Sequence, residues 1–169
     1  MEYIIVDDSN IEDFDTEGVW ALFGKLKNNT TPDEFYCLQV AQTKNIKNEI
    51  SADMKLLNCS SINNEPIEKE YINQFKEVIF NYKILPSPRE YIYYDIQKKF
   101  EELTFIIVDD NTKNDDERRK LEKEFAHQTK AIYWRNGGSY GSGDKIDYKH
   151  RKKIKKAQKQ DGKMIIELD

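Results

Sequence analysis

Two groups of acidic residues in this 169-residue chain could bind a metal ion or take part in catalysis. Glu122 falls in a predicted helix, where its carboxylate could hold Mg²⁺ beside a phosphate while waters complete the coordination. The alternative is a solvated helix face, on which Glu122 pairs with Arg118 one turn earlier. Paired aspartates also follow two similar apolar runs, at 7–8 and 109–110. Such pairs can bind a metal, but they more often form turns or cap the next helix.

Positive charge is concentrated between residues 149 and 159, KHRKKIKKAQK. We expect a helix over 148–159 that is basic almost all round. Such a helix can follow a nucleic-acid backbone through charge without reading its sequence. The alternative is a solvated surface that balances acidic neighbours. The candidate nucleic-acid-binding residues are Arg151, Lys152, Lys153, Lys155 and Lys156.

Several other site chemistries lack the spacing that they need. The two histidines, His127 and His150, lie far apart without neighbouring cysteines, which excludes a zinc-finger pattern. No serine lies in the GxSxG turn of a hydrolase. The glycine-rich stretch 135–144 lacks the spacing of a nucleotide-binding phosphate loop, although its glycines would let backbone amides approach a phosphate.

The elements that would position these groups begin with residues 18–24. This run is apolar and aromatic, which favours a buried strand. A polar stretch with adjacent asparagines and a Pro-Asp pair then predicts a loop, and FYCLQV predicts a second strand over 35–41. Two strands this close most simply pair as an antiparallel hairpin. Thr43 or Asn45 is the expected cap of a helix over 44–57.

This strand–strand–helix order resembles the first half of the GIY-YIG nuclease superfamily. Gly18-Val19-Trp20 stands in place of the family's GIY tripeptide, and Gln39-Val40-Ala41 stands in place of YIG. Farther along, the strand 105–109, the helix 116–129 and the segment 131–136, AIYWRN, are similar to the family's later elements.

The resemblance implies a nuclease site in which Glu122 binds Mg²⁺. Its catalytic positions would be Trp20, Gln39, Glu49, Glu122 and Asn136. Trp20 and Gln39 replace the two family tyrosines, and neither can act as a phenolic base. Glu49 replaces the family arginine, and its charge would repel a phosphate instead of stabilising it. The resemblance therefore implies an altered active site.

The rest of the sequence completes an α/β (α+β) fold. We expect a single globular domain over 1–169, with a GIY-YIG-like core of about 18–136 and a basic C-terminal extension over 145–169. A small mixed or antiparallel sheet is expected from the segments 3–7, 18–24, 35–41, 104–109 and 163–168. About five helices should flank it, near 44–57, 67–83, 89–101, 116–129 and 148–159.

The fourth of these helices carries the candidate metal ligand. Asn114 or Asp115 is its expected cap, because acidic and amide side chains suit the positive end of a helix. Phe125 and Ala126 should face inward, while Arg118 and Glu122 are expected nearer the exposed side.

The composition is that of a globular protein, with 34% charged and 38% hydrophobic residues. A net charge of −4 excludes a uniformly basic surface but is compatible with a local basic patch. The two cysteines lack CxxC spacing, which suggests reduced thiols. No apolar run approaches the roughly 20 residues that span a bilayer, so we expect a cytoplasmic protein with no membrane segment.

Three functions are compatible with these patterns. The first is a diverged GIY-YIG-like endonuclease that acts on DNA or RNA with Mg²⁺. The second is a catalytically inactive member of that fold that binds nucleic acid or a protein partner. The third is an interaction or inhibitor domain whose acidic surface meets a basic protein. A salt-sensitive affinity for nucleic acid separates the first two from the third.

Overall fold

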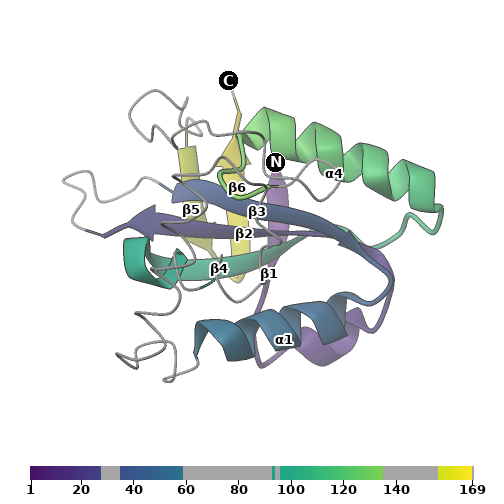
Figure 1. The fold of residues 1–169 in the computed structure, drawn as a ribbon, viewed down its shortest axis with the longest axis horizontal. Helices are drawn as coiled ribbons and strands as arrows, with labels where there is room; N and C mark the ends of the chain where they lie inside the picture. The colour runs from purple at the N-terminus through teal and green to yellow at the C-terminus, as the bar shows by residue number, and fades with distance from the viewer. Residues whose placement is uncertain (28–34, 59–92, 94–95, 135–155, 169) are drawn as a thin grey trace, which may run out of the picture.

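The computed structural model describes residues 1–27, 35–58, 93, 96–134 and 156–168. These residues form a mixed α/β fold with one six-stranded sheet, in which every neighbouring pair of strands is antiparallel (Figure 1). The strand order is β3-β2-β4-β1-β6-β5. The strands are β1 (Glu2–Val6), β2 (Gly18–Leu26), β3 (Phe35–Thr43), β4 (Phe100–Asp109), β5 (Lys156–Gln160) and β6 (Lys163–Glu167). The described helices are η1 (Ile11–Phe14), α1 (Ile46–Leu57) and α4 (Asp115–Thr129). None of the described helices is long and apolar enough to cross a membrane.

Strand β2 lies inside the sheet and contributes to a core on each of its faces. Trp20 and Leu22 pack on the side of α1, and Val19, Ala21 and Phe23 pack on the side of α4. All five side chains are fully buried. The apolar run that predicted a buried strand is therefore explained by helices covering both faces of the sheet.

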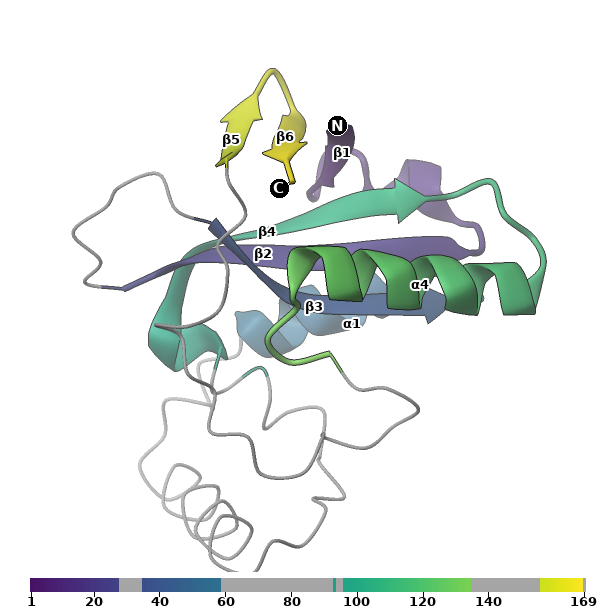
Figure 2. The same cartoon turned by 90° about the horizontal axis from the view of Figure 1, so that it is seen from above.

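The sheet is strongly curled. In Figure 2 the hairpin of β5 and β6 stands out of the plane of β2, β3 and β4. Ala157, Met164 and Ile166 from this hairpin join the core under α4. The Lys159 ammonium lies 5.6 Å from the centre of the Phe35 ring, so the two edge strands approach each other at one end.

Local sequence signals set the starts of both long helices. Asn45 accepts a hydrogen bond from the Asn48 amide at 2.9 Å, which confirms one of the two predicted caps of α1. Asn114 accepts from the amides of Asp116 and Glu117, which confirms the predicted cap of α4. The left-handed residue Lys130 then ends α4, with φ at 52°.

Two predicted helices need correction. Residues 156–159 do not end a basic helix, because they form β5 and pair with β6 across the turn at Asp161 and Gly162. The Asp161–Gly162 turn joins this segment to β6 as a tight hairpin, and the pairing buries Ala157. The predicted helix 89–101 is confirmed at Tyr93 and 96–99, but Phe100 already belongs to β4. The predicted helix 67–83 lies outside the described residues.

A buried cation fixes the start of α4 against the sheet. Arg118, predicted to lie nearer the exposed side, is instead fully buried. Its guanidinium forms ion pairs with Glu17, just before β2, and with Asp115, and donates to the Thr112 carbonyl at 3.1 Å. Lys44 also pairs with Asp115, and its ammonium holds the pKa of that carboxyl below the usual range. The predicted pairing of Arg118 with Glu122 is replaced by this network.

We predict that Arg118→Met destabilises the fold by about 1–3 kcal/mol, because the Thr112 carbonyl and the partly exposed Glu17 carboxylate lose their charged hydrogen-bond donor. Arg119→Met is the matched control, since the Arg119 side chain is 67% exposed. Urea unfolding of both variants measures the difference. An equal, small effect of both substitutions would show that the buried network does not hold α4 in place.

Candidate functional site at the edge of β3

The segment after α4 covers the outer edge of β3. The Ile132 amide donates to the Cys37 carbonyl at 3.1 Å, and the Tyr133 amide donates to the Leu38 carbonyl at 2.7 Å. These bonds satisfy backbone groups that an edge strand would otherwise expose. They also bring Trp134 against α4, where its ring lies 5.2 Å from that of His127.

Glu122 is held in this corner by two hydrogen bonds. The Trp134 indole donates to Glu122 Oε1 at 3.0 Å, and the backbone of Gln42, near the end of β3, supplies a second hydrogen bond. The carboxyl group is half-buried. Burial raises its pKa above the usual value, and the negative charge of Glu49 adds to this, whereas the Trp134 bond works against it. The Glu49 carboxylate on α1 therefore acts on Glu122 through space, as a smaller effect than burial and the two hydrogen bonds.

Two other predicted positions lie on the α1 side of the sheet. The side-chain oxygen of Gln39 accepts a hydrogen bond from the Tyr93 hydroxyl at 2.7 Å. Trp20 is fully buried and packs against Phe105, with the ring centres 5.5 Å apart. Its indole N–H has no hydrogen-bond partner among the described residues. Trp20 thus occupies the core, out of reach of a nucleic acid on the surface.

The remaining candidate residues are not brought to this corner within the described chain. Asn136 and the basic residues Arg151, Lys152, Lys153 and Lys155 lie outside the described residues. Lys156 opens β5, on the opposite edge of the sheet from β3. Among the catalytic positions that the structure describes, only Glu49 acts electrostatically on Glu122.

The repeated aspartate pairs serve as turn residues. The strands that precede them, β1 and β4, are neighbours, but they run antiparallel with Ile5 opposite Ile106, so the two pairs point to opposite ends. Asp7 accepts from the Ser9 amide at 2.8 Å, and Asp109 accepts from the Thr112 amide at 2.9 Å. Within the described part of the chain, no three histidine, cysteine or acidic side chains gather as a metal site.

Sequence reasoning did not predict the contacts that three residues make in this region. Gln42 and Trp134 supply the hydrogen bonds to Glu122, and Tyr93 contacts Gln39. The sequence did point to Trp134, since this residue lies in the segment that is similar to the closing element of the GIY-YIG family. Cys37 is not a nucleophile, because burial raises the pKa of its thiol to about 12.

The comparisons with known proteins found no match to this chain. No family model, no curated protein and no solved structure matches this chain.

The raised pKa of Glu122 predicts a pH-dependent stability. A proton binds the folded state more tightly than the unfolded state, so the free energy of unfolding falls as pH rises from the ordinary carboxyl range through the raised folded pKa. Glu122→Gln keeps an oxygen that can accept a hydrogen bond from the Trp134 indole. Because the glutamine side chain does not titrate, the variant avoids the fall in the free energy of unfolding that Glu122 causes as pH rises. We expect the melting temperature of the variant, relative to the unmodified chain, to increase between about pH 4 and about pH 7.

The matched control for this experiment is Glu124→Gln, an exposed glutamate on the same helix. Thermal unfolding followed by circular dichroism at several pH values gives the comparison. A constant difference between Glu122→Gln and the unmodified chain across that range would contradict the electrostatic assignment.

Proposed function

We propose that this chain is a diverged relative of the GIY-YIG fold that binds DNA or RNA through its basic segment and does not cut it. The order of the described elements supports the likeness. The hairpin of β2 and β3 leads into α1, β4 adds to the other side of β2, and α4 follows with Glu122. Each of these elements has a counterpart in the resemblance drawn from the sequence.

The observation that carries the loss of catalysis is the placement of Glu49, whose negative charge acts on Glu122. Where the family has an arginine that attracts the scissile phosphate, this chain has a second carboxylate. A phosphate that approaches this corner meets two negative charges, and its transition state gains no stabilisation. The burial of Trp20 supports the same conclusion, because its indole is not a base and lies in the core.

Binding is assigned to the cluster Arg151, Lys152, Lys153, Lys155 and Lys156. Neutralising phosphates with such a cluster releases counter-ions, so the affinity falls steeply with salt. Such a cluster of cations contacts the phosphate backbone, which positions the protein without reading the sequence.

The proposal predicts that the triple variant Lys152→Gln, Lys153→Gln and Lys155→Gln loses about tenfold or more in affinity for a short labelled duplex at low salt. The control carries Lys55→Gln, Lys120→Gln and Lys123→Gln, which remove three exposed lysines from α1 and α4. Fluorescence anisotropy over a range of salt concentrations measures both. Equal affinities of the two variants, or no binding by the unmodified chain, would contradict the proposal.

A Mg²⁺-dependent endonuclease is the second candidate, and one observation favours it. Glu49 and Glu122 are coupled carboxylates, and the Gln42 side-chain oxygen is buried without a hydrogen-bond partner among the described residues. Carboxylate and amide oxygens suit Mg²⁺, so these three residues would hold the ion. The ion would supply charge stabilisation at a phosphoryl oxygen. Cleavage of plasmid DNA or structured RNA that is lost in Glu122→Ala would establish this candidate and overturn the first.

A further inference from the structure

Two lysines from strands that are far apart in the sequence meet over one aromatic ring. The Lys25 ammonium, near the end of β2, lies 4.9 Å from the centre of the Phe35 ring. The Lys159 ammonium, from β5, lies 5.6 Å from the same centre. Phe35 opens β3 and is buried, so its ring supports both cations from below. The lysine pair marks the junction at which the curled sheet brings its two outer strands, β3 and β5, together.

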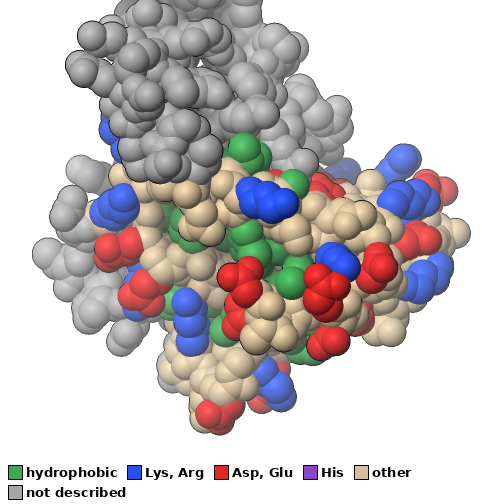
Figure 3. Space-filling model, turned by 90° about the horizontal axis from the view of Figure 1, so that it is seen from below, with side chains coloured by type: hydrophobic (Ala, Val, Ile, Leu, Met, Phe, Trp, Pro, Cys, Tyr) green, Lys and Arg blue, Asp and Glu red, His purple; other side chains and the backbone are tan. Residues whose placement is uncertain are grey.

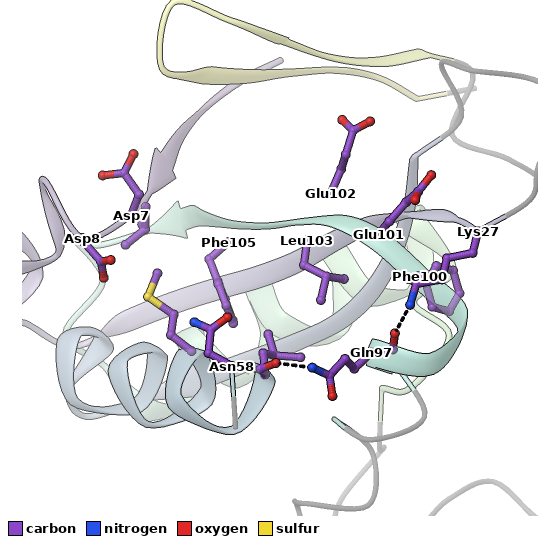
Figure 4. A pocket seen from close by; sticks show the side chains of 13 residues that line it. Asp7, Asp8, Lys27, Asn58, Gln97, Phe100, Glu101, Glu102, Leu103 and Phe105 are labelled. Atoms are coloured by element: carbon purple, nitrogen blue, oxygen red, sulfur yellow. Dashed lines mark hydrogen bonds between the residues drawn. The ribbon is translucent and has the colours of Figure 1, made fainter. Parts of the chain in front are cut away.

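One carboxylate is shared between these two cations. Glu102 pairs with Lys25 at 3.0 Å, and its charge also acts on Lys159. The backbone of Glu102 is left-handed, with φ at 50°, at a point where the pairing of β2 with β4 shifts its register. Leu103 and Phe105 line a groove of about 540 Å³ on the α1 side of β4, whereas Glu102 points away from it, toward the hairpin of β5 and β6 (Figure 4). The bend at Glu102 therefore brings its carboxylate to the lysine pair.

The junction holds more positive charge than this carboxylate neutralises. The Lys25 side chain is only 18% exposed and holds Glu102, while Lys159 is exposed and forms no ion pair with a described residue. Partial burial lowers the pKa of the Lys159 ammonium, Glu102 raises it, and the charge of Lys25 lowers it. An anion against Lys159 would offset the repulsion between the two ammonium groups. The junction is therefore suited to a negatively charged ligand.

The junction lies where the basic segment joins the described fold. Lys156 is the last of the candidate nucleic-acid-binding residues and opens β5, and Lys159 follows on the same strand. Figure 2 shows β5 starting beside the start of β3, at the opposite end of the sheet from the start of α4. That opposite end, where β4 stops and α4 begins, carries Asp109, Asp110, Asp115 and Asp116. A phosphate backbone is therefore attracted to the β5 end and repelled from the other.

The α1 face of the molecule has mixed charge. Figure 3 shows acidic and basic side chains interspersed with hydrophobic ones on this face. Lys47, in the first turn of α1, is paired with Glu12 of η1. Phosphate binding depends on several cations that are free to replace counter-ions. Charge therefore directs nucleic acid to the junction of β3 and β5 and not to the α1 face.

We propose that Lys159 and Lys25 form a phosphate-contacting site at this junction, over which the nucleic acid held by the basic segment continues. This site rests on the function proposed above and places the nucleic acid on the fold. Its backbone follows β5, with one phosphate against the Lys159 ammonium. Lys25 adds attraction from behind, and Glu102 reduces it. Phe35 is too deeply buried to stack on a base, so the contact reads no sequence.

Lys159→Gln tests the site, and Lys163→Gln on the same hairpin is its matched control. Ala157 and Met164 face the core under α4, so Lys159 shares that side and Lys163, next to Met164, points to the other. Fluorescence anisotropy with a short labelled duplex is measured over a range of salt concentrations. We expect Lys159→Gln to bind about three- to tenfold more weakly at low salt and to flatten the slope of log affinity against log salt by about 0.9. Lys163→Gln should keep the slope of the unmodified chain.

Glu102→Gln gives a test of opposite sign. Removing its charge should raise the affinity about two- to threefold at low salt, whereas Glu124→Gln, an exposed change on α4, should leave it nearly unchanged. Equal salt slopes of Lys159→Gln and Lys163→Gln, while the unmodified chain binds, would overturn this site and leave the proposed function standing. Equal affinities of Glu102→Gln and Glu124→Gln would also contradict the site. No binding by the unmodified chain would overturn both the site and the proposed function.

Discussion

The placement of α4 depends on the burial of Arg118. A fully buried guanidinium is tolerated only when acidic partners and carbonyl oxygens surround it, and here Glu17, Asp115 and the Thr112 carbonyl do so. Glu17 immediately precedes β2, so the network joins the start of α4 to the start of an inner strand. At the same end Gly18 allows close packing, because a Cβ atom there would lie 2.2 Å from the Asp109 carbonyl oxygen.

With α4 fixed in this way, the two faces of the sheet take different roles. On one side, α4 and the segment 131–134 place Glu122 beside the last residues of β3. On the other side, α1 covers only part of the sheet and leaves a groove along β4. The acidic corner at β3 disfavours phosphate. In our account, nucleic acid therefore binds through the basic segment.

The features that sequence could predict are those that depend on neighbouring residues. The caps Asn45 and Asn114, the run 18–24 and the hairpin that it forms with β3 all follow from local propensity and turn chemistry. The features that it could not predict depend on distant partners. The hairpin of β5 and β6 is an exception, because its Asp161–Gly162 turn is a local signal that the helical interpretation of 156–159 missed. Arg118, by contrast, is buried because Glu17, far earlier in the chain, meets it. Likewise, Gln39 and Glu122 gained their partners Tyr93 and Trp134 only through the tertiary fold.

The most direct test of the central claim is a ¹H–¹⁵N NMR titration of the chain with a short duplex in the presence of Mg²⁺. The Trp134 indole N–H, which is held by Glu122, reports on the edge of β3. Our account predicts salt-sensitive shifts at the amides of Lys152, Lys153 and Lys155, an unmoved Trp134 indole signal and an intact duplex. A shift of the indole signal together with cleavage of the duplex would contradict it, because nucleic acid would then be acting at the Glu49–Glu122 corner.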